Sequence, residues 1–187
     1  MVMHATDWIA LYGNRLRSVS AASLRRALNR PKHHCTWCGK PVSRRRKTWC
    51  SQACIDAFME RQPGVCAKRT IQRDRGVCQL CRLDTYRIRA LLVRLYLLSV
   101  KDPCWYAVWR SYMLLLNRKG FFLKLQHPYE LELAQADHIL PVCRGGGLCD
   151  ISGYRTLCVP CHVRITKTLN RAISREKRKV KQKKRKG

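Results

Sequence analysis

The apolar positions along this 187-residue chain separate into helix-spaced segments and two short strand-like runs. The longest helix-spaced segments are Asp84 to Val100 and Pro103 to Arg118, with Asp102-Pro103 as a cap and a first helical position. Their apolar side chains are expected to supply much of the core: Leu91, Leu92, Leu95, Leu98, Trp105, Trp109, Leu114 and Leu115. Trp105, Tyr106, Trp109 and Tyr112 could also stack on bases, but burial is favoured.

Two strand-like runs and a helix follow towards the end of the chain. The first run lies within Leu131 to Val142 and ends at a proline, and the second is Tyr154 to Val159. From Pro160 onward apolar residues recur every four positions at Ile165, Leu169 and Ile173, which indicates a helix with one buried stripe. The predicted order is strand, strand, helix.

The first 31 residues predict two short helices, around Asp7 to Arg17 and around Ser20 to Asn29, before Pro31. Two interpretations stay open for this segment: an arm that contacts the DNA backbone, or a solvated leader that is partly disordered. The DNA interpretation depends on five arginines, which are Arg15, Arg17, Arg25, Arg26 and Arg30. A transit peptide is less favoured than a short basic helix.

Eight of the twelve cysteines form close pairs with the spacing of zinc ligands. Two pairs bracket a basic turn and are expected to form a treble-clef-like knuckle that holds one structural Zn²⁺: Cys35, Cys38, Cys50 and Cys54. Ser51 should cap a helix that begins at the second pair and runs towards Gln62. His33 and His34 are interpreted as surface residues, because four thiolates already complete a tetrahedron.

A second structural Zn²⁺ is expected from two pairs more than seventy residues apart, Cys78/Cys81 and Cys158/Cys161. This site would link the beginning of the predicted C-terminal unit to the start of its last helix. The remaining cysteines are treated as ordinary thiols: Cys66, Cys104, Cys143 and Cys149. The glycines between the last two allow a close approach of the backbone to a phosphate, with Arg144 nearby.

The formal charge of +28 indicates a polyanionic partner. DNA is the expected partner, RNA stays open, and an anionic membrane is the weaker alternative. The expected phosphate contacts are Arg44, Arg45, Arg46, Lys47, Arg144, Lys167, Lys177, Arg178 and Lys179. After about Arg175 the last helix is expected to fray into a disordered basic tail. No apolar run approaches the roughly 20 residues that span a bilayer. We therefore expect a soluble intracellular protein, cytoplasmic in a prokaryote or phage, with a nuclear location open in a eukaryote.

Asp137, His138 and His162 carry the candidate chemistry. A divalent cation held by the Asp137 carboxylate and the His162 imidazole could polarise a phosphate oxygen and stabilise the departing 3′ oxygen. His138 is then left to activate water, because an imidazole with a pKa of about 6.5 is largely unprotonated near neutral pH.

These motifs resemble the HNH endonucleases, which are the ββα-metal or His-Me finger family. The matching residues, in order, are Asp137-His138-Ile139-x-Pro141-Val142, Gly145-Gly146-Gly147, Thr156-Leu157-Cys158-x-x-Cys161-His162 and Lys167-Thr168. With Cys78-x-x-Cys81 upstream, the stretch from Arg69 to Arg171 resembles the HNH domain of the zinc-finger, Ran-binding-domain annealing helicases. The resemblance implies His138 as general base and Asp137 and His162 as ligands of Mg²⁺ or Mn²⁺, with Zn²⁺ or Ni²⁺ as alternatives.

Two positions depart from the family pattern. Gly153 stands where the family has an asparagine that braces the loop carrying the base, and Ser152 or Asp150 is a candidate substitute. Gly153→Asn is therefore expected to keep or raise activity. One turn beyond His162, where some relatives have another ligand, the chain has Ile165 and Thr166. We expect two protein ligands for the catalytic cation.

The sequence predicts an α+β protein with four parts. They are a basic helical leader (1–31), a four-cysteine zinc knuckle (32–62), a zinc-stabilised ββα-metal nuclease unit (63–174) with a helical insertion (84–118), and a basic tail (175–187). The leading hypothesis is a metal-dependent DNA endonuclease, which the HNH resemblance implies would leave 3′-hydroxyl and 5′-phosphate ends. Double-strand cleavage would need a homodimer or two sequential nicks. The alternatives are a non-catalytic zinc-binding nucleic-acid-binding protein that keeps the fold, and a small basic protein of a ribonucleoprotein particle.

Overall fold

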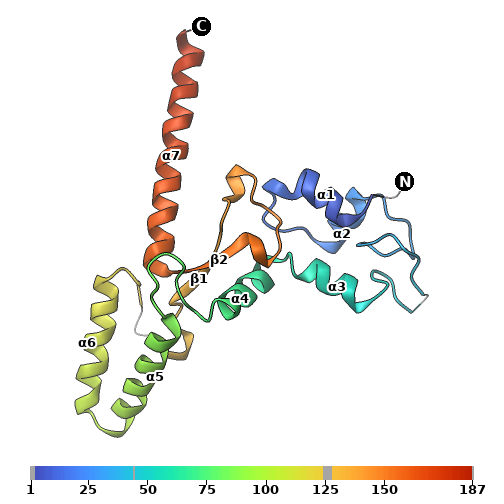
Figure 1. Ribbon diagram of the computed structural model, residues 1–187. Helices are drawn as coiled ribbons and strands as arrows, with labels where there is room; N and C mark the ends of the chain where they lie inside the picture. The colour runs from blue at the N-terminus through green and yellow to red at the C-terminus, as the bar shows by residue number, and fades with distance from the viewer. Residues whose placement is uncertain (1–2, 44, 124–127, 187) are drawn as a thin grey trace. The chain divides into compact units, whose positions relative to one another are not determined.

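The computed structural model, drawn in Figure 1, describes residues 3–43, 45–123 and 128–186. The chain forms two compact units, which we describe one at a time. The first unit comprises Met1–Arg73 with Ala136–Arg155, and the second comprises Asp74–Gln135 with Thr156–Gly187. Helices and one two-stranded sheet make up the described elements, so the expected mixture of helix and strand is confirmed.

Two short helices open the first unit. Helix α1 covers Ala5–Tyr12 and continues into a 3-10 turn at Gly13–Arg15, and helix α2 covers Ala21–Ala27. Ser20 caps α2 by accepting a hydrogen bond from the backbone N–H of Ser23. Both predicted helices are therefore present. Their apolar residues share one core with the cysteine knuckle, made of Ala5, Ile9, Val19, Leu24, Cys35, Trp37, Cys54, Phe58 and Leu148.

Two arginines of this segment bind the protein's own backbone. Arg30 is buried and its Nη2 donates to the carbonyl oxygens of Met3 and Trp37, at 2.6 and 3.3 Å. Arg25 donates to the carbonyl oxygens of Lys47 and Pro31. Because a guanidinium has five N–H donors in a fixed fork, it can join several carbonyl groups of a small irregular domain. The described part of the leader is thus packed onto the knuckle, and the solvated alternative is wrong for it.

The remaining elements of the first unit are two helices and the loop between the two strands. Helix α3 covers Gln52–Met59, helix α4 covers Pro63–Arg73, and the loop contains 3-10 turns at Val142–Arg144 and Ile151–Gly153. Arg73 at the end of α4 donates to the carbonyl oxygens of Ile151 and Tyr154, at 2.7 and 2.8 Å. The end of the loop is therefore held by α4.

In the second unit, helices α5 (Thr85–Lys101) and α6 (Cys104–Arg118) lie side by side as a hairpin (Figure 1). Asp84 caps α5 by accepting from the N–H of Arg87, and Asp102 accepts from the N–H of Cys104. The predicted pair of helices is confirmed, and so is the cap at Asp102, although α6 begins one residue after the expected Pro103. The cap at Asp84 was not predicted.

The expected burial of this hairpin is only partly right. Leu92, Leu95 and Trp109 are buried, as is Met113. The other expected core residues are half-buried at Leu98 and exposed by 39 to 50% at Leu91, Trp105, Leu114 and Leu115. The helices meet along one stripe, and within the described residues α6 is covered at few other positions. Helical spacing predicted the stripe, but the wider apolar face of α6 was wrongly assigned to the core.

Strands β1 (Ala134–His138) and β2 (Tyr154–Cys158) form a two-stranded sheet, and helix α7 begins directly after β2. The Ile139 N–H donates to the Gly153 carbonyl oxygen, and the Val159 N–H donates to the Leu133 carbonyl oxygen, so the strands are antiparallel with one constant register. A 3-10 turn at Pro128–Glu130 precedes β1. The predicted order of strand, strand and helix is confirmed.

Helix α7 covers Val159–Lys186, which differs from the disordered tail expected after Arg175. Apolar periodicity does end there, yet lysine, arginine and glutamine are favourable helix formers, and cations at a helix C-terminus interact well with its dipole. The prediction depended on apolar spacing alone and gave too little weight to these preferences. Across the described residues, every helix is too short or too polar to cross a bilayer.

Candidate active site and metal centres

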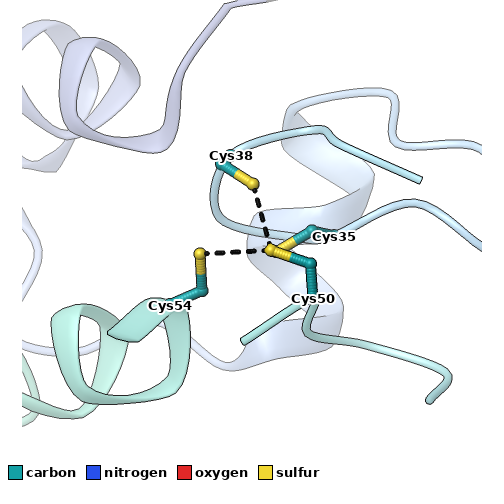
Figure 2. Close-up of side chains that lie close together, drawn as sticks. All are labelled: Cys35, Cys38, Cys50 and Cys54. Atoms are coloured by element: carbon teal, nitrogen blue, oxygen red, sulfur yellow. Dashed lines mark hydrogen bonds between the residues drawn. The ribbon is translucent and has the colours of Figure 1, made fainter. Parts of the chain in front are cut away.

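The first set of metal-ligand side chains is the knuckle of the first unit. The four sulfur atoms of Cys35, Cys38, Cys50 and Cys54 lie within 4.8 Å of one another. The Cys50 sulfur lies 3.4 Å from that of Cys38 and 3.6 Å from that of Cys54. Figure 2 shows the four side chains close together, with dashed lines for these two contacts. Sulfur atoms bound to one Zn²⁺ at about 2.3 Å lie about 3.8 Å apart, whereas a disulfide bond is about 2.05 Å long. The donor set therefore fits a tetrahedral zinc ion.

Local backbone geometry brings these thiols together. Gly39 has a φ of 79° and its N–H donates to the Cys35 carbonyl oxygen, which closes the turn between the first two cysteines. Cys54 lies in the first turn of α3, where Ser51 accepts from its N–H. Burial raises the pKa of Cys35, but backbone N–H groups outweigh it and lower that pKa to about 7. Burial raises the pKa of Cys54 to about 12. Cys35 is thus the more easily ionised of these two thiols, and a cation would favour ionisation of all four.

The second set lies in the second unit and consists of Cys78, Cys81, Cys158 and Cys161, again within 4.8 Å. The sulfur atoms of Cys81 and Cys158 are 3.6 Å apart. Backbone N–H groups, acting against burial, lower the pKa of Cys78 to about 6, whereas burial raises that of Cys158. This set could hold a second zinc ion. The long-range pairing expected from spacing is confirmed at the level of geometry.

The other candidate ligands lie outside these two sets. His33 is exposed, and the Nδ1 of the half-buried His34 lies 3.1 Å from the Lys32 carbonyl oxygen. All twelve cysteines are free thiols. Among the described residues, only the two cysteine sets gather three or more ligand side chains of His, Cys, Asp or Glu within 4.8 Å. The four leftover cysteines thus show no further metal centre in the described part of the chain.

His138, the predicted base, ends β1 with its ring packed on Tyr154. The ring centroids are 4.2 Å apart at an angle of 41°, and Tyr154 is itself 4% exposed. The Nε2 of His138 is buried and has no hydrogen-bond partner among the described residues. Leaving a buried polar atom unpaired costs about 1–3 kcal/mol. Such an atom is a candidate for contact with a water or ligand.

The remaining ring nitrogen of His138 fixes the tautomer. The ring makes a hydrogen bond with the backbone of Gly147, and since Nε2 has no partner, this bond involves Nδ1. The Gly147 N–H already donates to Asn14, so the bond runs from Nδ1–H to the Gly147 carbonyl oxygen. Burial lowers the pKa of His138 below 6.5, although Asp137 and Gly147 oppose the shift. At neutral pH His138 is therefore unprotonated, with its lone pair on Nε2.

Asp137, the predicted metal ligand, makes an ion pair that the sequence did not predict. The Nε and Nη2 of Arg155 donate to the Asp137 Oδ2 at 3.1 and 3.0 Å. The two side chains are 17% and 26% exposed, so the pair is partly shielded from water. Arg155 comes next to Tyr154 on β2, and the antiparallel register places it opposite Asp137. The strand register could not be read from the sequence, so this ion pair was not predicted.

The structure also explains Gly153, which replaces the asparagine of the HNH pattern. A Cβ at this position would lie 2.5 Å from the sulfur and 2.8 Å from the Cβ of Cys149. The loop keeps other supports: the Gly153 carbonyl accepts from Ile139, and Asp150 accepts from the N–H and hydroxyl of Ser152. The expectation that Gly153→Asn keeps or raises activity conflicts with this packing, because Cys149 already fills the space.

The glycine-rich loop packs against the protein itself. A Cβ on Gly146 would overlap the Leu140 carbonyl oxygen, and one on Gly147 would overlap that of Gly13. The Gly147 N–H donates to Asn14. At Gly146 and Gly147 the close backbone approach is therefore to the protein's own backbone, and the contact of this loop with a phosphate stays a prediction.

His162 lies in the first turn of α7, as expected, and is half-buried. It belongs to the second unit, whereas Asp137 and His138 belong to the first, so their joint action stays a prediction. Arg44 lies outside the described residues. The other predicted phosphate contacts are all exposed: Arg45, Arg46, Lys47, Arg144, Lys167, Lys177, Arg178 and Lys179.

Sequence comparison finds relatives for part of the chain. It is 31% identical over 115 residues to the human (Homo sapiens) DNA annealing helicase and endonuclease ZRANB3, covering 61% of this chain and 10% of that protein. The Bos taurus protein of the same name is 29% identical over 155 residues, which cover 78% of this chain and 14% of that protein. The Mus musculus protein is 30% identical over 115 residues. No family model matches the chain, and no solved structure matches it.

Part of the chain is similar to ZRANB3. It spans about a tenth to a seventh of the length of these relatives, whose name includes both a helicase and an endonuclease. The expected likeness to an annealing helicase is confirmed at about 30% identity, and a relationship to proteins that act on DNA is supported. The HNH assignment itself depends on the motifs described above.

Proposed function

We propose that this protein is a metal-dependent DNA endonuclease of the HNH type. His138 is the general base, and Asp137 and His162 are the protein ligands of a catalytic Mg²⁺ or Mn²⁺, with Zn²⁺ or Ni²⁺ as alternatives. The observation that carries this proposal is the unpaired Nε2 of His138 at the end of β1. The name of the homologous protein, which includes endonuclease, supports the same reaction class.

His138 takes the proton of the attacking water on Nε2. Its Nδ1–H is bonded to Gly147, so Nε2 is the basic nitrogen, and the lowered pKa keeps it unprotonated at neutral pH. Contact with Tyr154 fixes the plane of the ring. A substrate water that reaches Nε2 would also satisfy the buried atom that otherwise has no described partner.

The donor types of Asp137 and His162 suit a hard or borderline divalent cation, because one offers a carboxylate oxygen and the other an imidazole nitrogen. When bound, such a cation would polarise a phosphate oxygen of the substrate. Arg155 holds one oxygen of Asp137 and thereby orients the carboxylate. This support is analogous to the hydrogen-bonded partners that orient ligating carboxylates in metal sites.

The two cysteine sets have a separate, structural role in this proposal. Each set supplies four sulfur ligands, so a bound Zn²⁺ has no open position for a substrate. The second set includes Cys158 and Cys161, which stand on either side of the junction of β2 and α7. Zinc would therefore stabilise the segment that carries His162.

DNA is the proposed substrate because of the high positive charge and the DNA-acting relatives. The exposed basic residues of α7 and of the turn at Arg45 to Lys47 supply phosphate contacts. One such unit cuts one strand, so a double-strand break would need a second copy or a second nick.

A second candidate function is non-catalytic binding of nucleic acid. Two observations favour it: Arg155 already neutralises Asp137, and Gly153 replaces the bracing asparagine. A binding protein, however, gains nothing from an unpaired base nitrogen in a buried position. We therefore favour the nuclease.

Incubation of the zinc-loaded protein with supercoiled plasmid tests the proposal. With Mg²⁺ or Mn²⁺ we expect nicked plasmid, and without added cation we expect none. The nicks should be sealed by DNA ligase, because hydrolysis leaves a 5′-phosphate and a 3′-hydroxyl. An absence of nicking with every divalent cation would favour the binding protein, and nicks that ligase cannot seal would contradict the proposed chemistry.

A further inference from the structure

A basic pocket in the second unit has no assigned role. It has a volume of about 370 Å³, which lies within the range of small-molecule sites. Four of its nine lining residues are cationic and none is acidic. The lining consists of Lys119, Gly120, Phe122, Pro160, Val163, Arg164, Lys167, Thr168 and Arg171. Its charge suits a phosphate, and its apolar part suits a ring.

Phe122 is the unusual member of this lining. Its side chain is 69% exposed, while its neighbours Phe121 and Leu123 are 5% and 8% exposed. It also has a φ of 55°, a backbone conformation that bulky residues rarely adopt. Strained conformations of this kind persist where the surrounding structure imposes them, and they cluster at functional sites.

Asn117 at the end of α6 imposes this conformation. Its Nδ2 donates to the Leu123 carbonyl oxygen at 2.8 Å, and its Oδ1 accepts from the Leu123 N–H. The Phe121 N–H donates to the Leu116 carbonyl oxygen. Both flanks of Phe122 are therefore fixed, and the ring is held outward.

A second pocket of about 460 Å³ shares Phe122 and has the opposite charge. Its lining includes Glu130, Glu132 and Gln135. A phosphate would be repelled by the carboxylates and attracted to the α7 side, where Arg164 and Lys167 lie. The unlike charges of the two pockets that share Phe122 thus orient a nucleotide, with its phosphate towards α7.

We propose that Phe122 and the basic pocket bind one unpaired nucleotide of a DNA strand, whose base stacks on the ring. Stacking of a base on an aromatic ring above a cationic groove is how single strands are held without sequence preference. In a duplex both faces of each base are covered by neighbours, so this site selects unpaired DNA. The inference rests on the proposed function for the identity of the strand as substrate.

The bound nucleotide is distinct from the one that is cut. On a helix of 3.6 residues per turn, the α7 residues of the pocket lie roughly opposite His162. A helix with its side chains is about 10–12 Å across. The pocket therefore holds a flanking nucleotide, and its residues are separate from the proposed metal ligand.

Binding measurements on the 187-residue chain with His138→Ala test this proposal, because cleavage is then removed from the readout. The probes are a short single-stranded oligonucleotide, a duplex of the same length and free deoxyadenosine monophosphate. Phe122→Gly removes the ring and relieves the positive φ, so its melting temperature should be unchanged or higher. We expect about a fivefold or greater loss of affinity for the single strand and little change for the duplex. Phe122→Trp should retain the wild-type preference.

Lys119→Gln and Lys101→Gln form a matched pair, since both remove one exposed lysine of the second unit but only Lys119 lines the pocket. The Lys119 variant should lose more single-strand affinity. The proposal is overturned if Phe122→Gly binds the single strand as tightly as its parent, or if both DNA forms weaken equally. The proposal is also overturned if free deoxyadenosine monophosphate binds as tightly as the single strand, because the pocket would then be a site for free nucleotides. If the wild-type protein does not nick plasmid, the nuclease proposal fails, but the binding results expected for the Phe122 and Lys119 variants stay the same.

Discussion

This small protein contains two different kinds of reactive site. One is the second cysteine set, which includes Cys78, and the other is His138. In the cysteine set, four sulfur atoms lie within 4.8 Å of one another and can all bind one ion. At His138, a single buried nitrogen has no described partner. The cysteine set is a closed site whose ligands satisfy each other through a metal, whereas His138 is an open site that requires a group from outside.

This difference separates stability from chemistry. Loss of a ligand from a closed site removes metal-binding energy that is also folding energy, of the order of 10 kcal/mol for a structural zinc. Loss of His138 removes a side chain that adds little to packing beyond its contact with Tyr154. The first change should unfold the protein, and the second should leave a folded protein that does not react.

The largest expected effect comes from breaking the closed site with Cys158→Ser. The protein should bind one zinc ion where the wild type binds two, and the second unit should lose its cooperative thermal transition. Elemental analysis and circular dichroism measure these quantities. Cys104→Ser, at an exposed cysteine outside both sets, is the control and should keep two ions. Full zinc content and an unchanged transition in Cys158→Ser would show that this set does not hold the metal.

The next effect concerns the proposed catalytic cation. Asp137→Ala and His162→Ala should each stop plasmid nicking while both structural zinc ions are kept, because each variant removes one of two protein ligands. Raised Mg²⁺ or Mn²⁺ should restore part of the activity by mass action. His138→Ala lacks the base and should show no such recovery. An identical response of all three variants to added cation would remove the distinction between ligand and base.

Deletion of the residues after Arg175 should have a smaller effect. It removes eight lysine or arginine residues, so affinity for DNA should fall by about a hundredfold and depend less steeply on salt. Salt titrations of binding to one duplex measure both quantities, and nicking at saturating protein should persist. If the truncated chain has the same salt dependence as the full chain, α7 beyond Arg175 makes no phosphate contacts.

The smallest effect separates sequence resemblance from local packing. Gly153→Asn should lower stability by about 1–3 kcal/mol, because its Cβ overlaps the Cys149 side chain. Cys149→Ala with Gly153→Asn should recover part of the stability, since alanine removes the sulfur at 2.5 Å but keeps the Cβ at 2.8 Å. Thermal melts of the two single variants and the double variant give the coupling between the positions. A Gly153→Asn protein as stable as the wild type would support the original expectation from the family pattern.

Local patterns in the sequence predicted the parts of the fold that depend on short spacing. Pairs such as Cys35/Cys38 fix a turn within a few residues, and Ser51 and Asp102 cap helices through bonds to residues two or three positions away. The second cysteine set was also predictable, because two cysteine pairs without nearby partners leave few other combinations.

The contacts across the sheet could not be predicted in this way. Arg155 on Asp137 and Tyr154 on His138 depend on strand register, and a shift of one residue would place each on the other face. The contact between Gly147 and Gly13 joins segments more than a hundred residues apart with no periodic signal. Phe122 was missed because its exposure depends on a positive φ that Asn117 enforces.

The most direct test of the nuclease account is the nicking rate of His138→Ala. The variant, the wild type and His33→Asn are purified in parallel, each with two zinc ions and the same affinity for DNA. His33 is the matched control because it is an exposed histidine of the same unit, and asparagine tolerates its φ of 59°. We predict that His138→Ala nicks supercoiled plasmid more slowly than the wild type by about a hundredfold or more, while His33→Asn matches the wild type. Nicking by His138→Ala at the wild-type rate would contradict the account and favour a non-catalytic nucleic-acid-binding protein.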